Sequence, residues 1–509
     1  MTLLTRKKQL SAVKQTGSAV AETSTLDTTA SAMVVVEELS SNLDVERIER
    51  TLLRDSITSV KDLPGQIAVD VSFSAELKGT RLGTHAAGQP LSWIFLEACG
   101  FRTVECQAFT ISGGASSITA SGSGSSTTFR HGEIISQATS GATAKVVGDW
   151  HNGSPRIIVD KGSIVGTPDA TNQWTGSDSL AQATSSGAIA DVGFAAYPIT
   201  DPIKTITMAA GSPTASLAAG DVLQGATSGA IGVVETAVAI AGATIRYRAS
   251  RGAFSNGETV NRLVAGVATG IGTAHASVDE QFVDWAPLSL RPRIDGKSVT
   301  VAGCRGNVVF NLEVNRQVKM AFTFRGVLSD LTDRPLISGV QYDVSNPPLW
   351  ESSVIGYAIN DDLGEMDLAV EVTPCLSTAS LDMGVQLADR KCAGAVNGLL
   401  EVRGVDRQAT GSIDPEDTLE QDAGWLTAVQ GGGVYRLGMT IGGTDGNRFE
   451  IKMPGAQFTG AAEGDRDGFA TQDMSFRITG GDLFDLDSGA TGVSSIGGDN
   501  ELVLIYYTA

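Results

Sequence analysis

The sequence predicts a mainly β protein with about three domains. Its 509 residues are too many for one hydrophobic core, since domains typically hold about 100–200 residues. The 60 glycines and the low aromatic content of 6% are typical of short strands joined by turns. Apolar and polar residues also alternate strictly in segments such as 69–78, which is the pattern of a half-buried strand.

The first third predicts an arm, a strand and a short helix. Residues 1–33 are small and polar, and we interpret them as an N-terminal arm that orders against a neighbouring molecule, with a disordered terminus as the alternative. Residues 69–78 predict a strand of an antiparallel sheet. Its apolar face consists of Val69, Val71, Phe73, Ala75 and Leu77. A helix of two or three turns is predicted between Pro90 and Gly100, because proline favours the first turn and glycine the end.

The composition changes between residues 111 and 280, where Gly, Ala, Ser and Thr dominate. A short unit recurs there at 132–142, 179–188 and 221–230, and more faintly from 257. The spacing is roughly 40 residues, and each unit predicts a β-hairpin whose Ser-Gly turn joins two short strands. We therefore interpret 111–280 as an inserted β-repeat region.

The remaining sequence predicts a second copy of the first domain. Residues 299–312 and 318–327 predict strands, and the proline-bearing stretch 331–350 is interpreted as a linker. The order strand, helix, strand, strand then recurs at 398–414, 415–429, 449–458 and 474–478, before a final apolar strand at 501–507. The expected organisation is an arm (1–33), a first domain (34–110 and 281–330), the insert (111–280), a linker (331–350) and a second domain (351–509).

Charge and cysteine content exclude several classes of protein. A formal net charge of −20 argues against a surface that grips phosphates, although an acidic wall can line a passage for DNA; simple solubility is the alternative. The five cysteines include no CxxC pair, so we expect a reducing compartment. We expect neither a secretory signal nor a membrane span, and therefore a protein that is soluble and intracellular when made.

The sequence predicts no catalytic, cofactor-binding or metal site. The histidines are scattered without a zinc-protease spacing and are His85, His131, His151 and His275. Gly296-Lys297-Ser298 is similar to the end of a phosphate-binding loop, but Arg291 stands where that loop requires glycine.

Two acidic groups, at 360–362 and 482–487, lack the order of an EF-hand. We interpret them as turn residues, with a loosely held calcium ion as the alternative. Residues 464–468 predict a tight turn between two strands.

Several stretches, in order, resemble one family: the major tail tube proteins of long, non-contractile, siphovirus-like bacteriophage tails. The similar stretches are 3–15, 48–55, 71–79, 96–101, 302–308, 320–326, 464–468 and 499–504. They span about 300 residues outside the insert, and the insert is a departure from the family's pattern. The resemblance implies two tandem tail-tube-type β-sandwich domains, each with a short flanking helix, in addition to the inserted β-repeat domain.

The resemblance also implies a function. Strands of neighbouring subunits would join into stacked rings around a lumen that holds the tape-measure protein and conducts DNA during ejection, without specific DNA binding. A duplicated domain implies trimeric rings with pseudo-sixfold symmetry, and a single domain implies hexameric rings. The further partners would be tail tip and tail terminator proteins, and the location the virion tail, assembled in the host bacterial cytoplasm.

Two placements follow from this expectation. Because 170 residues cannot occupy a lumen, the insert is expected to project outward as decoration and to be dispensable. We expect it to have no ligand, with weak binding of cell-surface glycans as the alternative. The segment 53–65 carries both charge signs and is expected to dock on the adjacent ring through Arg54, Asp55, Lys61 and Asp62. An ordinary solvated hairpin is the alternative for this segment.

Two other functions stay open. Another virion structural or adhesion protein, such as a capsid decoration or tail tip component, would account for the β-repeats but not for the ordered matches. A virion enzyme that degrades glycans would account for an acidic β protein with paired carboxylates. We expect a structural protein and not an enzyme.

Overall fold

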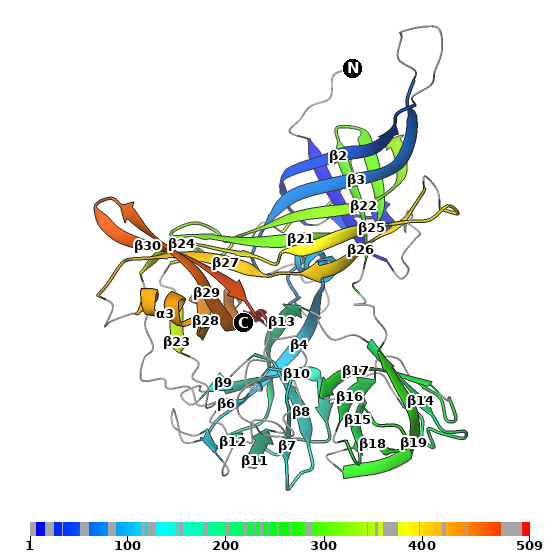
Figure 1. The fold of residues 1–509 in the computed structure, drawn as a ribbon, viewed down its shortest axis with the longest axis vertical. Helices are drawn as coiled ribbons and strands as arrows, with labels where there is room; N and C mark the ends of the chain where they lie inside the picture. Colours follow the sequence, from blue (N-terminus) through cyan, green and yellow to red (C-terminus); the bar gives the residue numbers. More distant parts are fainter. Residues whose placement is uncertain are drawn as a thin grey trace. The chain divides into compact units, whose positions relative to one another are not determined.

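The structure is a computed structural model of the chain. It describes residues 7–508 except 16–24, 33, 51–60, 80–87, 113–117, 121–127, 130, 149, 152–155, 177–180, 199–202, 218–220, 229, 235–237, 243, 252–253, 265–266, 280–284, 286, 344, 352–354, 360–374, 396–397, 420–423, 444–445 and 480–500. The described residues are mainly β, as the composition predicted (Figure 1).

The chain folds into two compact units, each built from three separate stretches of sequence. The first unit comprises Met1–Phe101, Trp285–Trp350 and Thr378–Gly411. The second comprises Arg102–Asp284, Glu351–Ser377 and Ser412–Ala509. The expected linker, 331–350, therefore lies within the first unit.

The first unit is an antiparallel sheet of long strands. Its order is β2 (Glu37–Ile48), β3 (Leu63–Glu76), β22 (Lys319–Asp333), β21 (Lys297–Glu313), β20 (Leu288–Ile294) and β1 (Lys8–Lys14). A further strand, β24 (Leu376–Asp382), pairs with the other end of β21 through residues 378–382. Within the expected arm, β1 thus pairs with β20 of the same chain.

Apolar alternation forms the core of this unit. In β3, Val69, Val71 and Phe73 are buried on one face, and Phe73 lies opposite Phe322 of β22. The helix α1 (Trp93–Ala98) covers that face, with the rings of Phe95 and Phe73 4.7 Å apart. The strands predicted at 69–78, 299–312 and 318–327 and the helix predicted after Pro90 are confirmed.

Two smaller groups of elements complete the first unit. The short 3₁₀ helices η1 (Thr25–Asp27) and η2 (Ala30–Ala32) lie beside β1. A two-stranded hairpin, β25 (Val385–Lys391) and β26 (Leu399–Arg407), packs on β21 and β22.

The second unit contains two six-stranded barrels. The first has the order β4 (Phe101–Thr110), β10 (Arg156–Val165), β8 (Thr143–Val146), β7 (Ile134–Gln137), β11 (Gln173–Gly176) and β12 (Ala181–Thr184). A bridge between Ile111 and Ser185 closes it. Short strands β5 (Thr119–Ala120), β6 (Thr128–Phe129) and β9 (Trp150–His151) accompany this barrel.

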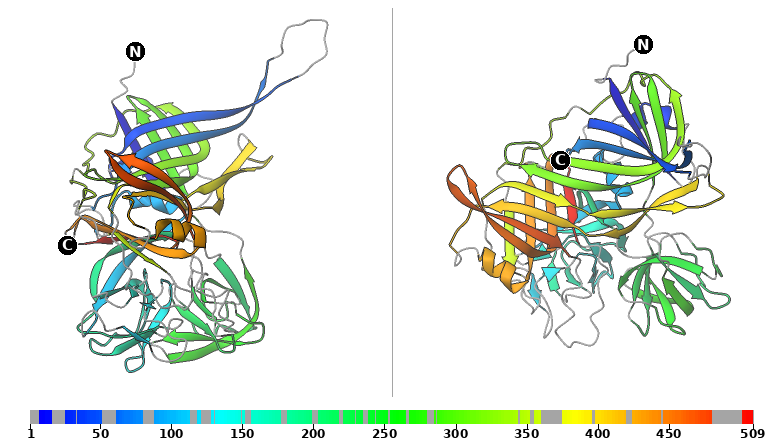
Figure 2. Two further views of the ribbon diagram at one scale, coloured as in Figure 1. Left: turned by 60° about the vertical axis from the view of Figure 1, so that its left-hand side comes forward. Right: turned by 45° about the horizontal axis from the view of Figure 1, so that its top comes forward.

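The second barrel closes through a ladder of paired residues between its first and last strands (Figure 2). Its order is β14 (Ile203–Met208), β17 (Thr244–Arg251), β16 (Ile231–Val234), β15 (Val222–Gly225), β18 (Thr259–Val264) and β19 (Val267–Asp279). The registers correspond as well: Val159 lies opposite Val146 in the first barrel, as Tyr247 lies opposite Val234 in the second. The insert therefore contains a duplicated barrel, and two repeat units fall within each copy.

The repeated Ser-Gly unit forms a hairpin in two of its copies. It joins β7 to β8 and β15 to β16, and in both turns the serine Oγ (Ser140, Ser228) accepts a hydrogen bond from the alanine N–H two residues later. The hairpin predicted at 179–188 is wrong. There, β12 pairs with β11 and β5, and the N–H groups of Ser112 and Ser186 close the barrel by bonding to Thr184 O and Thr110 O.

The C-terminal part of the second unit is a further antiparallel sheet. Its central strand β29 (Arg448–Arg466) pairs with β28 (Val434–Ile441), β30 (Phe469–Ile478) and β31 (Val503–Tyr507), while β23 (Ile355–Ile359) extends β28 and β27 (Thr410–Pro415) extends β30. The strands predicted at 449–458, 474–478 and 501–507 are confirmed. The helix predicted at 415–429 begins later, as α3 (Trp425–Gly431), because Pro415 still belongs to β27.

One strand joins the first barrel to this sheet. β31 pairs on one side with β29 and on the other with β13 (Ala190–Pro198), which follows the barrel strand β12. Val503, Ile505 and Tyr507 of β31 are buried in the same core as the side chains of the first barrel. The first barrel and the C-terminal strand thus share one hydrophobic core.

Candidate assembly surface

The β2–β3 hairpin presents the most exposed strand of the first unit. In the described part of the chain, β2 has a register with β3 and with no other strand. Its apolar residues Leu43 and Ile48 are about half exposed, as is Leu63, which lies opposite Ile48 at the start of β3. An unpaired strand edge that carries exposed apolar side chains is a template for pairing with another chain.

Of the four residues predicted to contact an adjacent ring, Lys61 and Asp62 lie at the start of the β3 side of this hairpin. Lys61 and Asp62 immediately precede Leu63, and Lys61 is exposed while Asp62 is partly buried. Arg54 and Asp55 lie outside the described residues. The structure therefore brings two of the predicted residues next to the exposed apolar pair Ile48 and Leu63, which the sequence reasoning did not single out.

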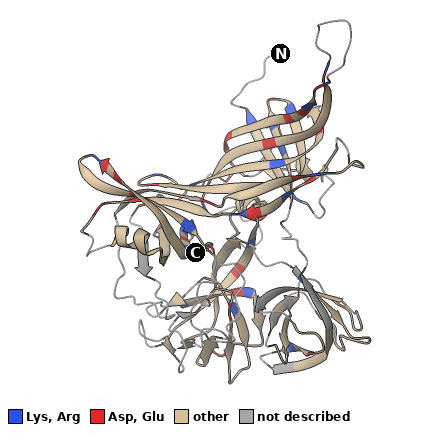
Figure 3. Ribbon diagram, viewed as in Figure 1, with Lys and Arg blue, Asp and Glu red and all other residues tan. Residues whose placement is uncertain are grey.

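A network around Arg325 of β22 braces the sheet that carries this hairpin. The Arg325 guanidinium donates two hydrogen bonds to Asp389 of β25, Nε to Oδ1 at 3.0 Å and Nη2 to Oδ2 at 2.9 Å. It also donates to Asp70 of β3 at 2.9 Å and to Asp44 of β2 at 2.8 Å. One guanidinium thus joins β2, β3, β22 and the β25–β26 hairpin; Figure 3 shows the charged residues along these strands.

The opposite charges in this network stabilise one another. The hydrogen bond from Arg325 lowers the pKa of Asp389 below its ordinary value, against the opposing effect of partial burial. Gln66 of β3 donates a further hydrogen bond to Asp389 at 2.5 Å, and Lys391 pairs with Glu46 of β2 at 3.3 Å. The sequence signal for the network was the polar face of β3 and β22, but the partner hairpin lies some 60 residues away in the chain and could not be identified from it.

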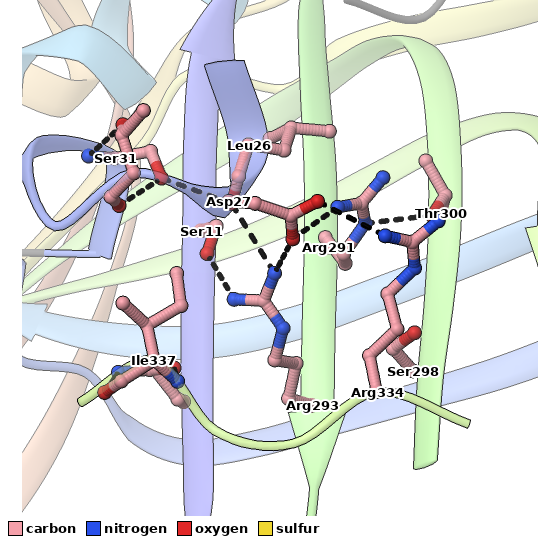
Figure 4. Close-up of polar contacts among 12 residues, drawn as sticks. Ser11, Leu26, Asp27, Ser31, Arg291, Arg293, Ser298, Thr300, Arg334 and Ile337 are labelled. Atoms are coloured by element: carbon pink, nitrogen blue, oxygen red, sulfur yellow. Dashed lines mark hydrogen bonds and ion pairs between the residues drawn. The ribbon is translucent and has the colours of Figure 1, made fainter. Parts of the chain in front are cut away.

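A second cluster of charges lies between β1, β20 and η1 (Figure 4). Arg291 and Arg293 of β20 are buried, and both bond Oδ1 of Asp27, at 2.7 and 2.5 Å. Arg334 bonds Oδ2 of the same carboxylate at 3.0 Å. Partial burial raises the pKa of Asp27, but the hydrogen bond from Arg291 and the three positive charges outweigh that effect and lower it.

The remaining motifs singled out in the sequence have structural roles where they are described. Asp295 and Gly296 form the tight turn between β20 and β21, both with positive φ. Gly296-Lys297-Ser298 is therefore the end of a hairpin turn and the start of β21. The turn predicted at 464–468 is confirmed, since Asp467 and Gly468 join β29 to β30. His131 is buried, and its Nδ1 accepts a hydrogen bond from the Gly148 N–H.

In the described part of the chain, no group of three or more His, Cys, Asp or Glu side chains could hold a metal ion. None of the helices among the described residues is long and apolar enough to cross a membrane. The acidic groups at 360–362 and 482–487 lie outside the described residues.

No protein-family model matches the chain, and the search of curated proteins finds no significant match.

Proposed function

We propose that this chain is a structural subunit of a bacteriophage tail tube, which polymerises as stacked rings around a DNA-conducting lumen. The observation that carries the proposal is the exposed apolar edge of the β2–β3 hairpin, on a sheet braced by Arg325. Pairing of that edge with a strand of a neighbouring subunit would satisfy its backbone groups and bury Leu43, Ile48 and Leu63. The ordered sequence resemblance supports the same function.

The proposal includes the partners expected from the resemblance. Rings would be trimeric with pseudo-sixfold symmetry if the C-terminal sheet acts as a second tube domain, and hexameric otherwise. The lumen would hold the tape-measure protein and then pass DNA, and the formal net charge of −20 favours passage without specific binding. Tail tip and terminator proteins would cap the two ends.

Electron microscopy of the concentrated full chain tests the proposal. We expect hollow tubes or rings, whose symmetry distinguishes three from six subunits. The substitution Ile48→Lys should abolish them while circular dichroism stays unchanged, because a charge on the edge opposes strand pairing between chains. The matched control is Ile240→Lys, which changes an even more exposed isoleucine in the connection between β16 and β17 and should assemble normally.

Other results would contradict the proposal. Tubes that form equally well with Ile48→Lys would exclude this edge as the contact. A chain that stays monomeric at every concentration, in the presence of tail tip protein, and that cleaves bacterial polysaccharide would favour the glycan-degrading enzyme instead.

A further inference from the structure

The arginine cluster holds more positive charge than its carboxylates neutralise. Arg291, Arg293 and Arg334 share the single carboxylate of Asp27. Of the three, only Arg334 has a second carboxylate within ion-pair distance among the described residues, Asp330 at 3.5 Å. Three guanidinium groups therefore face two carboxylates, and one positive charge is unpaired. Unpaired charge away from water is costly, so a cluster of this kind favours uptake of an anion.

Two donors of the cluster point to where such an anion would bind. Arg291 and Arg293 are fully buried, and Arg291 Nη2 and Arg293 Nε have no hydrogen-bond partner within the described part of the chain. The other N–H groups are used: Arg291 Nε donates to Thr300 and Arg293 Nη1 to Ser11, both at 2.8 Å. A buried guanidinium with an unsatisfied N–H is the exception in folded proteins.

The cluster is also open on one side. The side chains of Asp27 and Arg334 are 42% and 37% exposed, whereas the two arginines behind them are buried. Figure 4 shows the three guanidinium groups turned toward Asp27 from β20 and from the segment after β22. An occupant must therefore be small enough to pass Asp27 and Arg334, and it must accept hydrogen bonds from several directions.

We propose that this cluster is a binding site for a small oxyanion such as inorganic phosphate. Arg334 and the unpartnered Nη2 of Arg291 supply the donors, because guanidinium forks match the oxygen spacing of phosphate. The anion binds beside Asp27. The negative charge of Asp27 weakens the binding, but the positive charges of the three arginines outweigh this repulsion. Bound there, it bridges β20 and the segment that follows β22. It thereby stabilises the arginines that hold η1 through Asp27, independently of tube assembly.

Hydrogen exchange of the full chain tests the site, with phosphate as the probe against chloride at equal ionic strength and pH. At a phosphate concentration ten times its Kd, exchange in residues 25–32 and in β20 should slow by about tenfold, and the effect should saturate. Arg334→Gln should remove most of the effect. The matched control Arg316→Gln removes an exposed arginine that pairs with Glu313 elsewhere in the unit, and should leave the effect intact.

A second variant keeps the test independent of Arg334. Asp27→Asn removes the competing carboxylate, so phosphate should slow exchange by a larger factor than in the unmodified chain. An equal response of all variants would show a general salt effect and overturn the proposal. If hydrogen exchange slowed with rising protein concentration in the absence of phosphate, the bound anion would be an acidic side chain of a second copy. That result would also overturn the proposal.

Discussion

At the scale of single residues, Arg325 makes contacts of unequal strength with its three carboxylates. The Asp389 side chain is 20% exposed and bonded through both oxygens, whereas Asp44 is 55% exposed and bonded through one. We expect Asp389→Asn to destabilise the β25–β26 hairpin by about 1–3 kcal/mol, since hydrogen bonds between charged, partly buried groups are worth that much. Hydrogen exchange of β25 measures the change.

The matched control and the pH dependence sharpen this prediction. Asp44→Asn removes a solvent-exposed contact to the same guanidinium and should cost less than about 0.5 kcal/mol. The pKa of Asp389 is lowered in the folded chain from its ordinary value of 3.8, so the pair contributes fully above that pH. The contribution should disappear as the pH falls through the lowered pKa, where the unmodified chain should come to match Asp389→Asn. Equal losses for the two variants would contradict the assignment.

Close packing around Trp285 gives a second prediction at this scale. The buried indole lies against Gly404 of β26 and Gly100, and a Cβ added at Gly404 would meet the ring at 2.0 Å. Gly404→Ala should therefore destabilise the first unit by about 1–3 kcal/mol through overpacking. Gly394→Ala, where the added Cβ meets nothing within 4 Å, should be close to neutral in the same urea titration. A neutral Gly404→Ala would mean that β26 shifts without loss.

At the scale of elements, the sequence predicted several of the strands that bury one face. Alternation in β3, β21 and β22 was sufficient, because each buries one row of side chains. It failed at 179–188, where the local pattern matches the two true hairpins. The partner of β12 is set by closure of the barrel, a contact between segments about 70 residues apart that local patterning cannot encode.

The sequence predicted only part of the candidate surface, because local patterning does not encode contacts between distant segments. Charges at 53–65 drew attention to the β2–β3 hairpin, since a polar segment between two strands is typically exposed. The exposed apolar residues Ile48 and Leu63 were not singled out, because burial depends on which strands cover them. The pairing of Asp27 with Arg291 and Arg293 joins residues more than 260 positions apart and could be found only in the folded chain.

At the scale of the whole molecule, the two barrels of the insert differ in how they join the rest of the chain. In the second barrel, Lys204 of β14 lies opposite Asp279 of β19 in the strand register. The two ends of this barrel therefore lie side by side and could be joined by a short link. Its core is formed by its own strands. The first barrel instead shares its core with Val503, Ile505 and Tyr507, and the strand β13 that follows it pairs with β31.

The expectation that the insert is dispensable is therefore retained for the second barrel alone. Deleting residues 203–279 should leave a folded chain whose assembly, size-exclusion profile and circular dichroism match the unmodified protein apart from the lost mass. Deleting 111–280 should give aggregated or unfolded protein, because exposing three large side chains at about 1.5–3 kcal/mol each consumes much of a typical stability of about 5–15 kcal/mol. If the protein without residues 111–280 folded and assembled, β31 would need neither β13 nor the barrel core. If the protein without residues 203–279 failed to fold, the second barrel would support the remainder of the unit.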